Sequence, residues 1–235
     1  MPRISYPAIE QEAAAHGIDI LFWHIQEKEA ELQQLVGSCE SEASDTEQIR
    51  STARRIEKWA ERVLLAFWYG PDAKPAHRHN GAPYVEGAAE VISISHTGLH
   101  LAIARSVAGV GIDIEQRSPR ALRLASRFLD EREMAWVIDQ DKPEDAATLL
   151  WSAKEAAFKC AQIDHLSLLA DIHVHPTCLG TQWTVDVQEP GRAPSLSAMG
   201  GCHARLHLRH VLVTIAQVAE RKQVWYISLF LFYKV

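Results

Sequence analysis

Hydrophobic and polar positions follow two different rhythms along this chain. Residues 18–23 are a compact run of β-branched and aromatic side chains, which predicts an early strand. Residues 27–35 and, more strongly, residues 47–69 repeat apolar side chains at helical spacing, so we expect two helices there. Thr46 or Asp45 is expected to cap the longer helix, and the Gly-Pro pair that follows is expected to end it.

Strict alternation of apolar and polar residues begins in the middle of the chain. Residues 91–96 alternate, a Thr-Gly pair follows, and residues 99–104 form a second apolar run, which together predict a β-hairpin. Residues 110–115 then predict another strand. In that strand Asp113 and Glu115 leave on one side and the two isoleucines on the other.

The second half predicts helices first and strands afterwards. Helices are expected from about residue 121, over 134–138 and over 146–161, with Pro143 as a break. The predicted strands cover residues 172–175, 182–187, 205–208, 211–219 and 224–232. Hairpin-forming strands with helices between them indicate an α+β fold rather than a parallel doubly wound sheet. The chain has no Gly-x-Gly-x-x-Gly or Walker-type loop, which removes the main support for a dinucleotide or P-loop fold.

A faint internal repeat links the two halves. Residues 91–104 end in Leu-His-Leu-Ala-Ile-Ala, and residues 203–216 end in the similar His-Val-Leu-Val-Thr-Ile-Ala. Each half therefore offers a helix together with antiparallel strands.

Composition narrows the class of protein. The chain has 235 residues, of which 47% are hydrophobic and 23% charged, as in an ordinary soluble globular protein. The formal net charge of −6 argues against a general nucleic-acid binder. The four cysteines, which are Cys39, Cys160, Cys178 and Cys202, fit no zinc template. With no export signal and no apolar run long enough for a bilayer, we expect a cytoplasmic protein without a membrane partner.

Two runs carry the strongest chemical signal. Asp113 and Glu115 share one side of a strand, while Glu155 and Lys159 lie four residues apart on one face of a helix. Three carboxylates with a lysine beside them suit Mg²⁺ and a phosphate group. Taken singly, the acidic alternation is typical of a solvated face and the helical pair of a surface ion pair.

Other polar groups are weaker candidates. A zinc site could be drawn from Asp171, His173, His175 and Cys178, but no fourth ligand follows at a familiar interval, and the pattern favours a structural role. Arg55 and Arg62 lie on one face of the 47–69 helix, where they are either solvated or a phosphate-binding face.

A local basic cluster follows the acidic strand. Its arginines are Arg117, Arg120, Arg123 and Arg127. They are either solvated charge or a dock for an acidic partner.

Five motifs, in order, resemble the 4′-phosphopantetheinyl transferases, and within that family the longer, surfactin-synthetase-activating type. They cover residues 80–84, 93–97, 111–115, 127–133 and 151–159. The resemblance implies two similar α/β halves with antiparallel sheets, related by a pseudo-twofold axis. The first half, 1–108, would lie on the nucleotide side and the second, 109–235, on the metal and catalytic side of one monomeric unit.

The resemblance also implies an activity. Members transfer the 4′-phosphopantetheine group of coenzyme A to a serine of an apo acyl or peptidyl carrier protein, with Mg²⁺ or Mn²⁺, and release adenosine 3′,5′-bisphosphate. Two alternatives stay open, which are another Mg²⁺-dependent phosphotransferase or hydrolase and a non-catalytic coenzyme A-binding protein. The carrier protein that is served is not specified by the motifs.

Site residues follow from the resemblance by position. The implied metal ligands are Asp113, Glu115 and Glu155. The implied coenzyme A contacts are Ser95, His96, Lys159, Gly81, Pro83 and Tyr84, with Arg55 and Arg62 as the looser choices for the 3′-phosphate. Glu155, Lys159 and His96 are the implied catalytic residues, and the serine's proton would go to Glu155 directly or through a metal-bound water. The family often has lysine where this chain has Ala82, so Arg78 or the helix arginines are expected to compensate. The role of Glu133 stays open.

Overall fold

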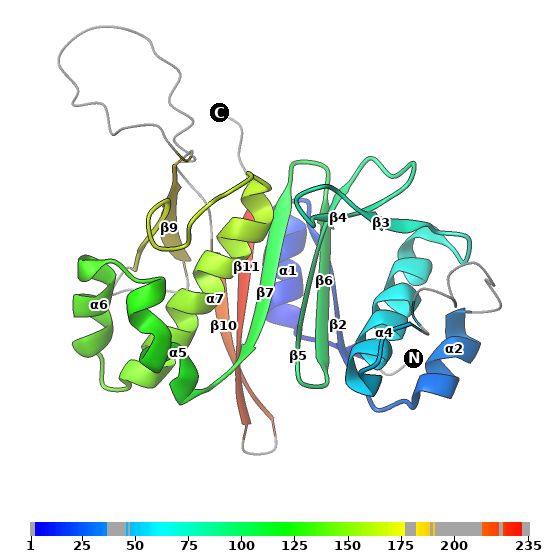
Figure 1. Cartoon of the computed structure of the whole chain (residues 1–235), viewed down its shortest axis with the longest axis horizontal. Coiled ribbons are helices and arrows are strands. Elements are labelled where there is room, and N and C mark those ends of the chain that lie inside the picture. Colours follow the sequence, from blue (N-terminus) through cyan, green and yellow to red (C-terminus); the bar gives the residue numbers. More distant parts are fainter. Residues whose placement is uncertain are drawn as a thin grey trace, which may run out of the picture.

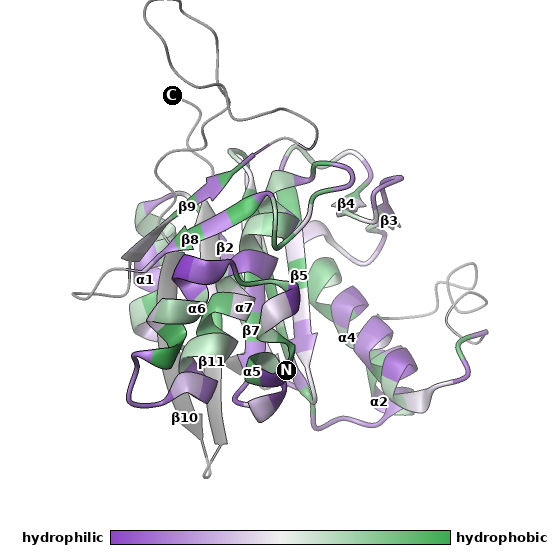
Figure 2. Cartoon of the chain, turned by 60° about the vertical axis from the view of Figure 1, so that its left-hand side comes forward, coloured by the Kyte–Doolittle hydropathy of each residue, from purple (hydrophilic) through white to green (hydrophobic). Residues whose placement is uncertain are grey.

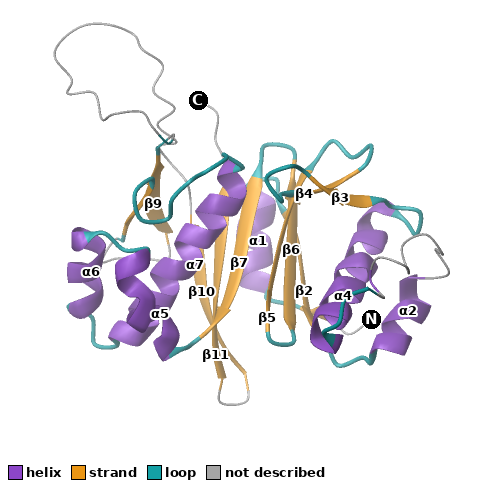
Figure 3. Cartoon of the chain, in the orientation of Figure 1, coloured by secondary structure: helices purple, strands orange, loops and turns teal. Residues whose placement is uncertain are grey.

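The computed structural model has helices interleaved with antiparallel sheets, which confirms the α+β class (Figure 3). It describes residues 3–36, 46, 48–176, 182–188, 190, 213–220 and 223–231. The elements of the first half are β1 (Arg3–Ile4), α1 (Pro7–Ala15), β2 (Asp19–His24), α2 (Glu29–Val36), α4 (Thr52–Tyr69), β3 (Pro75–His77), β4 (Pro83–Val85), β5 (Val91–Thr97) and β6 (His100–Ser106). The elements of the second half are β7 (Val110–Gln116), α5 (Pro119–Leu124), η1 (Ala125–Arg127), α6 (Glu131–Ile138), α7 (Pro143–Ala161), β8 (Ile172–His175), β9 (Gln182–Val187), β10 (Val213–Glu220) and β11 (Gln223–Leu231).

Each half contributes one antiparallel sheet. The first sheet has the order β1-β2-β6-β5, and the second has the order β7-β11-β10-β9-β8. A separate two-stranded ribbon pairs β3 with β4. The long helix α7 lies over β7 and its neighbours, whereas α4 and α2 lie beside the first sheet (Figure 1). The antiparallel pairing that the hairpin pattern predicted is therefore confirmed, while the pseudo-twofold relation stays an expectation.

The two sheets meet where β5 runs beside β7. Ser93 Oγ accepts a hydrogen bond from the backbone N–H of Ile112 at 3.0 Å, and Ser95 Oγ accepts one from that of Ile114 at 3.2 Å. The residue numbers of the paired positions increase together, from Ser93 and Ile112 to Ser95 and Ile114, so β5 and β7 run in the same direction. Serine side chains thus satisfy edge N–H groups of β7 at this seam, and a buried N–H left unpaired would be costly.

Two hydrophobic clusters hold the molecule together. One joins α1, β2 and β6 of the first half to β7, α6 and α7 of the second. The other lies within the first half, between α2, α4 and the first sheet. Along α4, hydrophobic and hydrophilic stretches alternate in Figure 2, as expected for a helix with one buried face. Because the first cluster takes residues from both halves, the boundary at 108/109 does not separate two independent cores, and it stays a prediction.

Two predicted helix boundaries were wrong, and one short β-ribbon was missed. The long first-half helix begins at Thr52 rather than at residue 47, because Ser51 has extended backbone angles and its Oγ accepts the N–H of Arg54. Neither Thr46 nor Asp45 is therefore its cap. Pro143 is the first residue of α7 rather than a break before it, a position where proline's missing N–H costs nothing. The short β3–β4 ribbon was not predicted, because residues 71–80 read only as a loop.

Several predictions concern residues outside the described ranges. The strand predicted at 205–208, most of the second repeat and Cys39, Cys178 and Cys202 fall there. Among the described helices, none combines the length and apolarity needed to cross a membrane.

Candidate active site

A glycine allows the helix that carries Glu155 and Lys159 to approach the acidic strand. A Cβ atom built on Gly111 of β7 would lie 1.9 Å from the backbone O of Ala156 and 2.8 Å from the Cβ of Cys160. No side chain fits at such distances, so α7 packs on β7 only because residue 111 has none. This close packing brings the acids of β7 to the face of α7 on which Lys159 lies.

Asp113 lies at the centre of the predicted site. Its side chain is buried, and Oδ1 accepts hydrogen bonds from Ser95 Oγ at 2.8 Å and from Lys159 Nζ at 2.7 Å. The other oxygen, Oδ2, is buried without a hydrogen-bond partner among the described residues. A buried carboxylate oxygen without a donor is costly, so it marks a place where a positive group fits.

The other two acids are destabilised in their charged forms. Burial, and then the nearby charge of Asp113, raises the pKa of Glu115 to about 7, although Trp151 Nε1 donates to its Oε1 at 2.9 Å. Burial also raises the pKa of Glu155, an effect that the neighbouring Lys159 opposes. The three carboxylates therefore influence one another across the β7–α7 contact and resist being charged together.

These residues fit a divalent cation that shares its coordination shell with a substrate. A bound cation would pair with the open oxygen of Asp113, and it would also stabilise the charged forms of Glu115 and Glu155, which burial disfavours. Within the described ranges, however, His, Cys, Asp and Glu side chains form no group of three or more that could hold a metal ion by themselves. Mg²⁺ usually keeps waters and substrate phosphate oxygens among its ligands, so a few carboxylates suffice.

His96 is held from the other side, by α4. Its Nε2 lies 2.9 Å from Arg54 Nη1, and its Nδ1 lies 3.7 Å from Glu57 Oε1. A guanidinium only donates, so Nε2 accepts and the proton of the imidazole resides on Nδ1, facing Glu57. Ser95 therefore hydrogen-bonds directly to Asp113, whereas the side chain of His96 contacts Arg54 and Glu57 of α4.

The two predicted helix arginines have other contacts. Arg55 donates to Glu29 Oε1 at 2.7 Å and also to Ile49 O at 2.8 Å, which ties α4 to α2. The guanidinium of Arg62 lies 5.0 Å from the ring centre of Trp59. Arg54, which the motifs did not single out, is the α4 arginine that contacts His96.

The turn between β3 and β4 carries Gly81, Pro83 and Tyr84. Gly81 has a positive φ of 82°, which only glycine adopts without strain, and its N–H bonds Arg78 O at 2.9 Å. The guanidinium of Arg78 lies 5.3 Å from the ring centre of Tyr84, so this arginine is present where the lysine is missing at Ala82.

Sequence reasoning missed Lys154. This lysine is fully buried, and its Nζ donates to Phe128 O at 2.6 Å and Leu168 O at 2.8 Å and pairs with Glu133 at 2.7 Å. Glu133 also completes a capping box at the start of α6 and accepts the N–H of Val174 at 2.8 Å. The open question about Glu133 is thus answered by a structural role. The signal was a lysine whose neighbours three and four residues away on the helix, which are Leu150, Trp151, Ala157 and Phe158, are all apolar.

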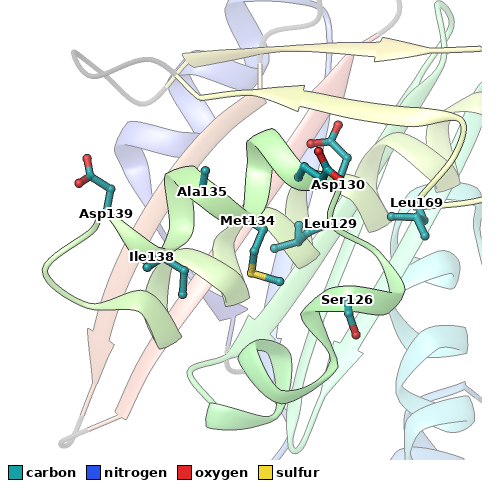
Figure 4. Close-up of a pocket in the computed structure, with 9 residues that line it drawn as sticks. Ser126, Leu129, Asp130, Met134, Ala135, Ile138, Asp139 and Leu169 are labelled. Carbon is teal, nitrogen blue, oxygen red and sulfur yellow. The ribbon is translucent and has the colours of Figure 1, made fainter.

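The candidate zinc site does not assemble among the described residues. His173 Nδ1 contacts Asp130 Oδ2 at 3.0 Å, and His175 Nε2 contacts Asp186 Oδ2 at 3.0 Å, so each histidine has its own acid. A hollow lies beside α6, where Leu129, Met134, Ile138 and Leu169 line it near Asp130 (Figure 4). It includes none of the predicted site residues.

The candidate site thus consists of a buried acidic strand, a facing helix with a lysine, and one carboxylate oxygen without a hydrogen-bond partner among the described residues. The model of the 4′-phosphopantetheinyl transferase superfamily matches residues 109–199, which include all three acids and Lys159. The chain is also 38% identical over 69 residues to the 4′-phosphopantetheinyl transferase Sfp of Bacillus subtilis strain 168, covering 28% of this chain and 31% of that protein. This segment of the chain is therefore similar to the 4′-phosphopantetheinyl transferase superfamily, the family that its motifs resemble.

The extent of these matches is limited. The matched segment spans 31% of the length of the curated relative. A crystal structure of holo-[acyl-carrier-protein] synthase from Thermotoga maritima is similar at a TM-score of 0.34 and 15% identity, over 54% of this chain and 65% of that one. That likeness is too distant to assign a function.

Proposed function

We propose that this protein transfers the 4′-phosphopantetheine group of coenzyme A to a serine of an apo carrier protein and releases adenosine 3′,5′-bisphosphate. The observation that supports this most directly is the open Oδ2 of Asp113 beside Lys159, within the segment that matches the superfamily. Mg²⁺ or Mn²⁺ is the proposed metal, held by Asp113, Glu115 and Glu155. A cation bound there supplies positive charge to the diphosphate of coenzyme A.

The side chains of this site divide the work of phosphoryl transfer, which is mostly positioning and charge stabilisation. Lys159 is proposed to donate to the diphosphate oxygens from the side of α7, and Arg54 from the side of α4, where His96 Nε2 accepts from Arg54 and orients its guanidinium. Ser95 holds Asp113 Oδ1 and the strand N–H of Ile114, which fixes the carboxylate relative to the seam.

Glu155 is the proposed proton acceptor for the carrier serine. It lies one helical turn before Lys159 on α7, so the same helix that neutralises the diphosphate also presents the base. General-base catalysis of this kind contributes about 10²- to 10⁴-fold to a rate.

The carrier protein is proposed to approach from α5 and η1. Arg120, Arg123 and Arg127 are exposed there, whereas Arg117 is paired with Asp145. Exposed arginines steer an acidic partner, and the effect weakens as salt increases. A cytosolic monomer is proposed as the working form, and Cys160 forms no disulfide with another described residue.

Intact-mass spectrometry of several apo carrier proteins, each incubated with coenzyme A, Mg²⁺ and the enzyme, tests the proposal. We expect a mass gain of one phosphopantetheine group on at least one carrier, and its loss with EDTA or with Glu155→Gln. Hydrolysis of coenzyme A without a carrier product would identify another phosphotransferase or hydrolase. Binding of coenzyme A without any turnover would identify a non-catalytic binder.

A further inference from the structure

One asparagine connects the β3–β4 turn of the first half to the end of α7 in the second. Asn80 Nδ2 donates to the backbone O of Gln162 at 2.9 Å, across 82 positions of sequence. Asn80 Oδ1 accepts the N–H of Ala82 at 3.1 Å within its own turn. The two contacts fix the orientation of the amide, because a carbonyl requires the donor end and an N–H requires the acceptor end.

The carbonyl that Asn80 reaches is at the C-terminal end of α7. Gln162 caps this helix in the left-handed conformation, with φ of 50°, and its N–H returns to Phe158 O at 3.4 Å. Carbonyls at a helix end have no partner within the helix, so one that meets a side-chain donor is stabilised. Lys159 lies only one turn away on the same helix.

The turn itself is rigid. Arg78 N–H bonds Ala82 O at 2.9 Å, Gly81 N–H bonds Arg78 O at 2.9 Å, and Asn80 adds a side-chain bond inside the same turn. A shift of α7 therefore has to move the whole turn, including Gly81 and Tyr84, as long as the Asn80 bond holds.

A second contact runs parallel to the first but is weaker. His79 Nε2 lies 2.8 Å from Asp164 Oδ2, and the two side chains are 80% and 47% exposed. Exposed pairs contribute little, whereas Asn80 is half-buried. Figure 1 shows the β3–β4 ribbon and the C-terminal end of α7 both at the upper end of the molecule.

We propose that Asn80 is a positioning residue that holds the coenzyme A turn at a fixed distance from the catalytic helix, through its bond to the Gln162 carbonyl. The inference rests on the proposed function, because it assigns the turn to the nucleotide end of coenzyme A and α7 to its diphosphate. Binding both ends of one rigidly spaced ligand requires that the two protein parts be spaced correctly before it arrives. Asn80 itself transfers no proton and touches no reacting atom.

Asn80→Ser tests this with little disturbance of the turn. A serine hydroxyl can still accept a hydrogen bond from the Ala82 N–H and so form a weaker turn of the same kind. The serine side chain is too short to donate to Gln162 O as well. We expect the KM for coenzyme A to rise about 3- to 10-fold, the factor that corresponds to one net neutral hydrogen bond, with kcat almost unchanged. A merely structural role would instead lower the melting temperature and the active fraction without moving KM.

Two further variants separate the explanations. Asn80→Asp keeps the turn acceptor and also loses the donor, so it should raise KM at least as much as Asn80→Ser. If only the aspartate variant raises KM, added negative charge is the cause and the inference is overturned. His79→Ala, which removes the exposed contact, should leave KM within about twofold of the wild type.

The wild-type protein separates failure of this inference from failure of the proposed function. If the wild type loads no carrier with coenzyme A and Mg²⁺, the proposed function fails, and the assignment of the turn fails with it. If the wild type is active and Asn80→Ser has the wild-type KM, the activity stands and only the role of Asn80 is overturned.

Discussion

Two lysines of α7 pair with carboxylates of other elements, and the two pairs differ in how completely their polar groups are hydrogen-bonded. Lys154 is fully buried, and its ammonium has three acceptors: two backbone carbonyls and Glu133. Lys159 contacts Asp113 Oδ1 and, at 3.3 Å, the backbone O of Ile112, while Asp113 Oδ2 has no hydrogen-bond partner among the described residues. Only five positions of sequence separate the two lysines.

The difference indicates which pair serves structure and which serves chemistry. A buried network in which each group has a partner fixes one arrangement of the chain around it. A network with an open carboxylate oxygen stores an unfavourable interaction that a ligand can relieve. The Lys154 pair therefore organises α6, β8 and the loop before β8, whereas the Asp113–Lys159 pair is the one that we propose to bind a cation and a phosphate.

Asp113→Asn should produce the largest effect. It removes the charge that the proposed cation and Lys159 both use, so transfer to the carrier should fall by about 10³-fold or more, which corresponds to several kcal/mol of lost stabilisation. The melting temperature should not fall, because the repulsion between the acids is reduced. Timed intact-mass assays and thermal melts measure the two effects, and normal turnover in this variant would reject the metal assignment.

Lys154→Met should produce the opposite pattern. Glu133 would remain buried without its partner, so the free energy of unfolding should fall by roughly 3–5 kcal/mol. Adding Glu133→Gln removes the unpaired charge and keeps an acceptor for Val174, so it should recover part of that loss. Lys159→Met is the matched variant on the same helix, and urea titrations should show a smaller loss, because Ser95 Oγ still donates to Asp113. A stable Lys154→Met protein would contradict the structural role.

Gly111→Ala should affect both regions at once. The added Cβ would press on the backbone of Ala156 and on Cys160, so α7 must shift away from β7. We expect the free energy of unfolding to fall by about 1–3 kcal/mol, as for overpacking in a core. Activity should fall as well in the folded fraction, because Lys159 and Glu155 move with the helix. Urea titration and the carrier assay measure the two losses. Gly17→Ala, at a positive φ of 71° outside this contact, should cost stability through backbone strain but leave the activity of the folded fraction unchanged.

The positions of the acids and the lysine of the candidate site could be predicted from the sequence, because they depend on local residue patterns. The alternation around Asp113 and the helical spacing of Glu155 and Lys159 placed the acids and the lysine on facing sides of two elements. The partners of Asn80 and Lys154 could not be predicted, because Gln162 and Leu168 contribute backbone carbonyls, which leave no trace in residue type. The spacing of Arg55 and Arg62 on one helix suggested a shared phosphate-binding face. That spacing gives no information about other helices, and the guanidinium of Arg55 in fact pairs with Glu29 of α2.

The smallest expected difference between the Lys154–Glu133 pair and the Asp113–Lys159 pair is in the pH dependence of the free energy of unfolding. The pKa of Glu115 is raised to about 7 from 4.5, mainly by burial and then by Asp113. Between these values the folded protein keeps a proton that the unfolded chain releases, so the free energy of unfolding of chelator-treated protein should fall as pH rises. After allowance for partial exposure, the fall should be about 1–2 kcal/mol.

Glu115→Gln should reduce this slope, because glutamine does not titrate, and the part that remains is expected from Glu155, whose pKa burial also raises. Lys154→Met should keep the full slope although its overall stability is lower. Trp151→Phe keeps an aromatic ring against Phe128 but loses the donor that lowers the pKa of Glu115, so its slope should extend to higher pH. Added Mg²⁺ should raise stability most above pH 7, where the acids are charged, since a ligand stabilises the state that binds it. Urea titrations at intervals of pH measure all of these slopes. A wild-type slope unchanged by Glu115→Gln would show that the open acidic pair is not the source of the pH dependence.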